Sequence, residues 1–238
     1  MVKINIRKYF PLVLVFLVLA CMDSHGDKKS YNTPSSSNIP ANTDGQDDSL
    51  FTSKYALKPD AIDSKNLQFF KIDSQKSMLI WSCVTHTGYV KFKGGDIGVL
   101  NDTIVRGKFA VAMDSIRDTD ISYDLMRQVL DNTLKSDSFF QVNKYPLSIL
   151  TLTHLKNIGG QKYLVGANLQ IKEIAKPIKF TAQISHSDSS IVVLTNSFVV
   201  DRTKWGITIY SRNFKQTDKS FLFTDSVKIK VAAIFYKR

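Results

Sequence analysis

The sequence predicts an all-β protein whose antiparallel strands form either a sandwich or a closed barrel. Apolar and polar residues alternate over short runs, and in the clearest run one face carries Val227, Ile229, Val231, Ala233 and Phe235. Gly, Asn and Asp interrupt such runs about every ten residues. No helix of ordinary length separates most of them, which disfavours parallel crossover units. Closure of the sheet would also remove its exposed edges.

Ten strands follow from this alternation. They are predicted at 69–72, 78–85, 88–93, 96–100, 103–114, 147–155, 163–172, 179–186, 191–200 and 227–236. Turns are predicted where Gly, Asn, Asp or Ser cluster, at 93–96, 101–102, 157–160 and 188–190. A chain of 238 residues with 43% hydrophobic content can bury one sizeable core, so we expect one main domain from 67 to 238.

One helical segment interrupts the strands and is predicted to cover an end of the β-structure. Three- and four-residue steps place on one helix face Leu125, Met126, Val129, Leu130 and Leu134. The start of the helix is expected to be capped by side-chain oxygens of Asp118, Asp120 and Ser122. After the helix, Phe139 and Phe140 bring two large rings back to the body before Pro146 ends helical geometry. These rings either form a lid or simply fill the edge of the core.

The amino terminus has the pattern of an export signal. Lys3, Arg7 and Lys8 precede an apolar run from 10 to 20 that is too short to span a bilayer. Its end, Val18-Leu19-Ala20-Cys21, resembles a bacterial lipoprotein cleavage box. We therefore expect residues 1–20 to be removed as a lipoprotein signal peptide and Cys21 to be acylated.

The segment 21–66 then reads as the lipidated cysteine followed by a disordered tether, because Ser, Asn, Asp, Lys and Thr dominate most of it. Acyl chains on Cys21 would anchor the exported protein to a membrane of the bacterial cell envelope, facing the periplasm or the cell surface. The alternative is an ordinary soluble secreted protein.

Charge and cysteine content restrict the partners. Removal of three basic residues with the signal takes the chain from +11 to +8, a balance that favours anionic partners such as phospholipid head groups or a pyrophosphate. Export argues against a nucleic acid as partner. With Cys21 modified, only Cys83 remains, so no internal disulfide can form, and Cys83 is expected to be a small buried apolar side chain.

The sequence offers no motif for catalysis. It contains neither a Gly-x-Ser-x-Gly elbow nor a phosphate-binding loop. Its four histidines, His25, His86, His154 and His186, lack metal-ligand spacing, so we expect no metal and no enzymatic centre. His86 lies between two threonines at a strand end, where it is either a titrating side chain at a barrel mouth or a structural histidine.

Several motifs in a fixed order resemble the YceI-like family of periplasmic, lipocalin-like proteins. The resemblance runs from Phe69 to the carboxyl terminus and rests on 72–73 (ID) with Ser77, 85–92 (THTGYVKF), 109–116 (FAVAMDSI), 134–140 (LKSDSFF) with 144–146 (KYP), 165–178 (VGANLQIKEIAKPI) and 201–207 (DRTKWGI). Lys76 and Glu173 depart from the family pattern. The resemblance implies an eight-stranded antiparallel barrel whose elongated apolar interior takes an isoprenoid-tailed amphiphile. It implies no catalytic centre and no cofactor beyond a bound polyisoprenoid or quinone-like lipid, and it allows a homodimer.

Two functions remain open, a lipid-binding module and a non-catalytic scaffold of the cell envelope. The large apolar residues that would line a ligand slot, or fill the interior, are Trp81, Phe92, Phe109, Met113, Phe139, Phe140, Phe180, Phe198, Trp205 and Ile207. A polar head group at the mouth would meet Arg202, Lys204, Lys176 or His86. Arg202 is preferred because its planar guanidinium can bind a pyrophosphate at two points. The same side chain could instead pair with Asp201 or Asp225.

Overall fold

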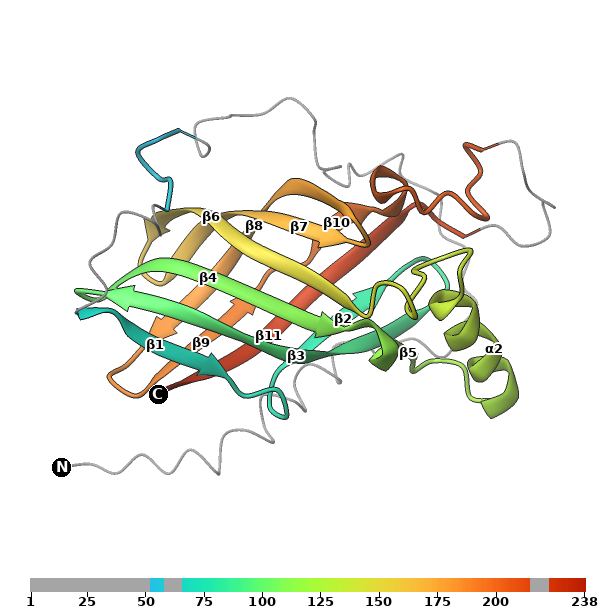
Figure 1. The fold of residues 1–238 in the computed structure, drawn as a ribbon, viewed down its shortest axis with the longest axis horizontal. Helices are drawn as coiled ribbons and strands as arrows, with labels where there is room; N and C mark the ends of the chain where they lie inside the picture. The colour runs from blue at the N-terminus through green and yellow to red at the C-terminus, as the bar shows by residue number, and fades with distance from the viewer. Residues whose placement is uncertain (1–51, 58–65, 215–222) are drawn as a thin grey trace, which may run out of the picture. The chain divides into compact units, whose positions relative to one another are not determined.

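The computed structural model describes residues 52–57, 66–214 and 223–238 (Figure 1). The strands are β1 (Gln68–Ile72), β2 (Met78–Ser82), β3 (Thr87–Leu100), β4 (Thr103–Ala112), β5 (Arg117–Asp118), β6 (Leu147–Gly159), β7 (Lys162–Ile171), β8 (Ile174–His186), β9 (Ser190–Thr195), β10 (Phe198–Asp201) and β11 (Ser226–Lys237). The described helices are the 3-10 turns η5 (Met113–Ser115) and η6 (Arg202–Trp205) and the α-helix α2 (Asp124–Lys135). The predicted signal peptide, Cys21, His25 and most of the predicted tether lie outside the described residues.

Eight antiparallel strands form a closed ring. Its order is β11, β2, β3, β4, β6, β7, β8 and β9, and β9 pairs back with β11 from Ser190↔Tyr236 to Leu194↔Ala232. The prediction of an eight-stranded antiparallel lipocalin-like barrel is confirmed, and the sandwich is excluded. Closure leaves no long sheet edge within the ring, as the sequence argument anticipated.

At two positions in the ring, two short strands take the place of one long strand. β1 and β2 both pair with β3 and β11, and β9 and β10 both pair with β11. A buried hydroxyl bridges each break: Ser77 Oγ accepts the N–H of Ile234 at 3.0 Å, and Thr195 Oγ1 accepts that of Val231 at 2.8 Å. These side chains replace the missing backbone partners of β11, so the wall stays hydrogen-bonded across both breaks.

The Gly94-Gly95 pair lies inside a strand, so the turn predicted at 93–96 is wrong. β3 runs unbroken from Thr87 to Leu100, and its register against β4 shifts between Phe92 and Gly94. A Cβ on Gly95 would come within 2.7 Å of the Phe109 ring and 2.8 Å of the Lys108 carbonyl oxygen. Glycine therefore marks a β-bulge with close backbone approach here.

Helix α2 differs from its prediction in two respects. Its N-cap is Tyr123, and no side chain caps it, so the capping role given to Asp118, Asp120 and Ser122 is wrong. Its predicted apolar face is split: Leu130 and Leu134 are buried, whereas more than half of the surface is exposed in Leu125, Met126 and Val129. The helix therefore contacts the barrel through a narrow strip, and spacing alone could not show how wide that strip is. Among the described residues, no helix has the length and apolar character needed to cross a membrane.

A short piece of the predicted tether pairs with the barrel wall. Ala56 forms a bridge with His154, and the N–H of Leu57 donates to the Thr153 carbonyl at 2.7 Å. The paired region of β4 and β6 ends at Lys108↔Thr151. The bridge therefore occupies the stretch of β6 that β4 leaves unpaired.

Candidate ligand-binding cavity

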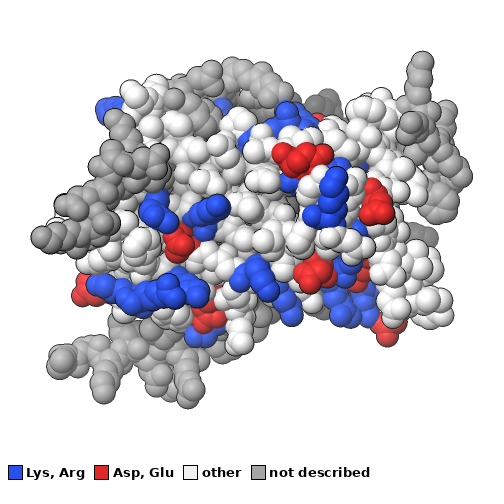
Figure 2. Space-filling view, in the orientation of Figure 1, with Lys and Arg blue, Asp and Glu red and all other residues white. Residues whose placement is uncertain are grey.

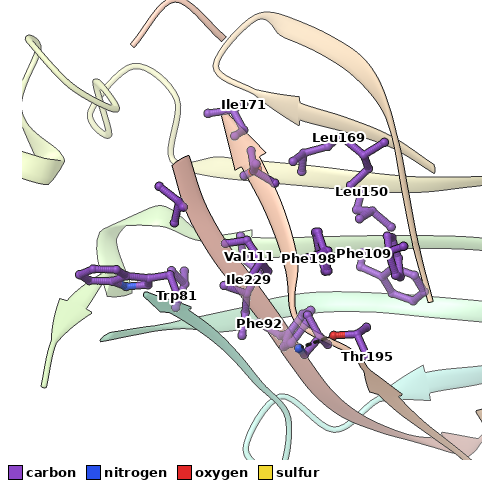
Figure 3. A pocket seen from close by; sticks show the side chains of 18 of the residues that line it. Trp81, Phe92, Phe109, Val111, Leu150, Leu169, Ile171, Thr195, Phe198 and Ile229 are labelled. Atoms are coloured by element: carbon purple, nitrogen blue, oxygen red, sulfur yellow. Dashed lines mark hydrogen bonds between the residues drawn. The ribbon is translucent and has the colours of Figure 1, made fainter. Parts of the chain in front are cut away.

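The barrel encloses a cavity of about 240 Å³ (Figure 3). One water needs roughly 10–15 Å³ of such space, so this cavity is far larger than a packing defect. Every strand of the ring contributes to its lining, and almost all of these side chains are apolar. On β11 the lining residues are those of the predicted apolar face, Val227, Ile229, Val231, Ala233 and Phe235. The interior is thus an open apolar space, a point that the sequence left undecided.

Most of the predicted cavity residues are brought together in this lining. They are Trp81, Phe92, Phe109, Met113, Phe139, Phe140, Phe180 and Phe198. The rings of Phe180 and Phe198 stack with their centroids 4.6 Å apart, although β8 and β10 are not hydrogen-bonded to each other. Strand alternation puts every second side chain inside a barrel, which is why local sequence could predict the members of this set that lie on strands.

One end of the cavity is covered by α2 and the turn that follows it. This end, called the α2 end below, is where β2 finishes and β11 begins, as the pair Ser82↔Lys228 shows. Leu130 and Leu134 of the helix line the cavity, as do the two rings behind it. Phe139 is only 4% exposed, and its centroid lies 5.1 Å from that of Phe140. The pair therefore packs the edge of the core and closes the cavity at the same time.

Most of the motif at 201–207 packs into the barrel wall and does not line the cavity. Asp201 Oδ1 accepts the backbone N–H of Thr203 at 2.9 Å and so caps η6. Trp205 donates its indole N–H to the carbonyl of Leu169 on β7 at 3.0 Å. Trp205 and Ile207 are 2% and 1% exposed, but neither belongs to the cavity lining. Their predicted place in the cavity is corrected: they pack the surrounding core.

Arg202 borders the cavity, but its hydrogen-bonding capacity is already used. A guanidinium has five N–H donors. Those of Arg202 reach Oδ1 of Asp225 at 3.2 Å and the carbonyl oxygens of Thr224 at 3.0 Å, Ile207 at 2.7 Å, Ile209 at 2.8 Å and Phe223 at 3.4 Å. The other oxygen of Asp225 accepts from Ser211 and Asn213. The preferred head-group role of Arg202 is therefore replaced by a structural one, the alternative that pairs it with Asp225.

The remaining predicted head-group residues separate into two kinds. Lys204 is exposed on η6 and Lys176 is half-buried on β8, and neither lines the cavity. His86 belongs to the lining and lies in the loop between β2 and β3 at the α2 end. On the face shown in Figure 2, Lys and Arg side chains are dispersed among uncharged residues and interleaved with Asp and Glu.

Trp81 supplies a polar atom to the mostly apolar wall. The residue is 8% exposed, and its indole nitrogen is buried without a hydrogen-bond partner among the described residues. Buried indole N–H groups normally have a partner, so this donor stands out. The lining hydroxyl of Ser148, by contrast, already donates to Gln170 at 2.7 Å. The indole packs over the backbone of Gly88, where a Cβ would come within 2.3 Å of the ring.

Two carboxylates converge on His86. Its Nδ1 lies 3.3 Å from Asp118 Oδ2 and 3.3 Å from Asp120 Oδ1. Sequence reasoning missed this cluster because the aspartates were assigned to helix capping. The pairing of β5 with β3, Asp118↔Gly88, brings them to the histidine. Burial raises the pKa of Asp118, the N–H of Ile121 opposes that rise, and the nearby Asp120 carboxylate adds to it.

A closed barrel of eight antiparallel strands around a cavity large enough for one small ligand defines a lipocalin-like protein. Residues 70–235 match the model of the YceI-like domain. The match covers well over half of the chain, and the protein belongs to the YceI-like family.

Two solved structures illustrate the relationship. The structure of BcnA from Burkholderia cenocepacia is 16% identical with a TM-score of 0.55, over 68% of this chain and 98% of BcnA. A polyisoprenoid-binding domain from Saccharophagus degradans, implicated in plant cell wall breakdown, is 15% identical with a TM-score of 0.51, over 71% of this chain and 98% of that domain. At such identities the likeness concerns the fold alone. No match was found among curated proteins.

Proposed function

We propose that the protein is a non-catalytic binding protein or carrier for an isoprenoid-tailed amphiphilic lipid, of the polyisoprenoid or quinone kind. The observation that carries the proposal is the apolar cavity of about 240 Å³ inside the barrel. Burial of apolar surface contributes about 25 cal/mol per Å², so a long tail offers enough area for tight binding after association costs. The fold shared with a polyisoprenoid-binding domain supports this ligand class. An open interior disfavours the scaffold alternative, which requires a filled one.

The polar head of the lipid would lie at the α2 end. The unpaired N–H of Trp81 can donate to a head-group oxygen, and His86 lies in the neighbouring loop. Figure 3 shows Trp81 on one side of the lining and Phe109 on the opposite side. The tail would extend from the first toward the second, past side chains that are almost all apolar. Trp81 takes over the orienting role that the sequence assigned to Arg202.

Filling the cavity tests the proposal. Ala182 and Ala175 both lie on β8, but Ala182 lines the cavity and Ala175 is exposed. Delipidated protein is titrated with farnesol in a calorimeter. Wild type and Ala175→Phe should bind one molecule, whereas Ala182→Phe should bind at least about tenfold more weakly, since its ring occupies the tail's space. Equal binding by the two variants, or no binding by any protein, would contradict the proposal.

We also propose that Cys21 is acylated and anchors the protein to a membrane of the cell envelope. The charged start, the short apolar run and Ala20-Cys21 support this. Cells are labelled with an alkyne fatty acid, and Cys21→Ser is compared with Cys83→Ser. The first variant should lose label and leave the membrane fraction, while the second keeps both. Labelling and membrane retention by Cys21→Ser would rule out anchoring at that residue.

A further inference from the structure

A second polar site lies beside the cavity, at the α2 end. One ring nitrogen of His86, one oxygen of Asp118 and one oxygen of Asp120 all lie within 4.8 Å of one another. The histidine belongs to the loop between β2 and β3, and Asp118 ends β5. The N–H of Thr119 donates to the Thr87 carbonyl at 2.8 Å and ties the two segments together. The cluster therefore rests on paired backbone and not on a loose loop.

The other carboxylate oxygens are held by backbone donors. Asp118 Oδ1 accepts the N–H groups of Asp120 at 3.1 Å and Ile121 at 2.8 Å. Asp120 Oδ2 accepts the N–H of Thr87 at 2.6 Å. These bonds fix both carboxylates and leave Asp118 Oδ2 and Asp120 Oδ1 directed at His86. A preorganised set of one imidazole nitrogen and two carboxylate oxygens results.

The two nitrogen–oxygen distances fit a tetrahedral metal ion. Nδ1 lies 3.3 Å from each carboxylate oxygen. Zinc–nitrogen and zinc–oxygen bonds of about 2.0–2.1 Å give edges of about 3.3–3.4 Å in a tetrahedron. An ion could therefore contact Nδ1 and either oxygen without a large movement of the backbone.

Burial of Asp118 provides an independent indication of a cation. The residue is 1% exposed, and its Oδ2 is buried without a hydrogen-bond partner among the described residues. A single Nδ1 proton cannot serve two oxygens well when each lies 3.3 Å away, at the long end of hydrogen bonding. A buried carboxylate in this position lacks compensation that a bound cation would supply.

We propose that His86 Nδ1, Asp118 Oδ2 and Asp120 Oδ1 bind a divalent transition-metal ion of the zinc class. Imidazole with carboxylate favours such ions, whereas calcium takes six to eight oxygens and magnesium an octahedral shell with several waters. Three protein ligands leave a fourth position open, and His86 also belongs to the cavity lining. The ion would thus lie at the cavity wall. The proposal goes beyond lipid binding and stands whether or not a lipid is bound.

The test is a zinc titration of the full chain, without an affinity tag and freed of metal with EDTA. Asp118→Asn and Asp120→Asn each keep an oxygen for the backbone N–H groups while replacing the ligand oxygen by an amide. His86→Gln removes the nitrogen ligand, and Asp114→Asn, at the exposed Asp114 of η5, is the matched control. Loss of partners outside the ligand shell already costs about 10–100-fold in metal affinity, so loss of a ligand should cost at least about 100-fold. Wild type and Asp114→Asn should retain the site.

Cobalt(II) gives a second readout, because a tetrahedral cobalt site has intense visible bands. We expect these bands in wild type and Asp114→Asn but not in the three ligand variants. Thermal unfolding of the metal-free variants confirms that each is folded. No zinc binding by wild type would overturn the proposal and leave His86 as a side chain that only contacts two carboxylates. Zinc binding that persists in Asp118→Asn, Asp120→Asn and His86→Gln would overturn it too, since other residues would then hold the ion.

Discussion

Arg202 and His86 both border the cavity at the α2 end, yet their surroundings differ. Each N–H donor of Arg202 is matched by an oxygen of the protein, and Asp225 is in turn held by two further side chains. Beside His86, Asp118 presents a buried oxygen with no hydrogen-bond partner among the described residues. Charge and burial are common to both clusters. An unmatched polar atom therefore separates a candidate binding site from a structural one.

The largest expected effect is the loss of stability when Arg202, the structural residue of the two, is replaced. Arg202→Met leaves the Ile207 and Ile209 carbonyls and the Asp225 carboxylate without their partner, so the free energy of unfolding should fall by about 3–5 kcal/mol. Urea denaturation measures it. An exposed lysine of β11 gives the control, and Lys228→Met should change the value by less than about 0.5 kcal/mol. A stable Arg202→Met variant that loses binding of a prenyl diphosphate would reverse the assignment.

The two rings behind α2 should differ from each other. Phe139→Ala removes a buried ring that contacts Phe140 and Phe223 and lies 5.3 Å from the Arg202 guanidinium, so a loss of about 3 kcal/mol is expected. Phe140 is only half-buried, and Phe140→Ala should cost less. Both variants open the α2 end, so a bound lipid should dissociate faster from the folded fraction. Unchanged dissociation from both would show that these rings only pack.

The unmatched donor of Trp81 gives a smaller and more selective effect. Trp81→Phe removes the N–H without leaving an acceptor of the protein unpaired, so the lost hydrogen bond to the ligand should weaken farnesol binding by about 0.5–1.5 kcal/mol, roughly 2–10-fold. Squalene, which has an isoprenoid chain and no polar head, is the control ligand. Its affinity should change less than that of farnesol. Equal losses for both ligands would mean that Trp81 supplies only apolar contact.

The smallest expected effect is on the stability of the metal-free protein. Its sign tests whether the Asp118 carboxylate in the His86 cluster lacks compensation. Asp118→Asn removes a buried charge but keeps an oxygen for the two backbone donors, so EDTA-treated protein should become more stable by up to about 1 kcal/mol. Added zinc should stabilise wild type but not Asp118→Asn, because a ligand that binds the folded state raises the free energy of unfolding. Destabilisation of the metal-free variant would show that the Asp118 carboxylate is already compensated by His86.

The sequence predicted those features that depend on local alternation. The inward face of β11 and most of the aromatic lining follow from period-two patterns. The Gly94-Gly95 bulge did not, because paired glycines are equally compatible with a turn and with close strand contact. The sequence also did not predict the exposed side of α2, because the same spacing suits a wide or a narrow contact with the barrel.

The polar clusters depend on distant partners. Arg202 receives its acceptors from residues beyond η6, up to Asp225, and no local pattern distinguishes such a donor from one that awaits a ligand. His86 meets Asp120 across 34 positions of sequence, through the pairing of a two-residue strand that the alternation could not reveal. Long-range pairing, and not residue type, therefore determined which polar residues are structural.

The central claim, that the barrel holds an isoprenoid-tailed lipid, is tested most directly by organic extraction and mass spectrometry of protein purified from its native cells. Wild type and Ala175→Phe should release one class of isoprenoid-tailed lipid in near-equimolar amount, and Ala182→Phe should release little or none. If wild type releases no lipid and the extracted protein takes up no farnesol, the cavity is not a lipid site and the claim fails.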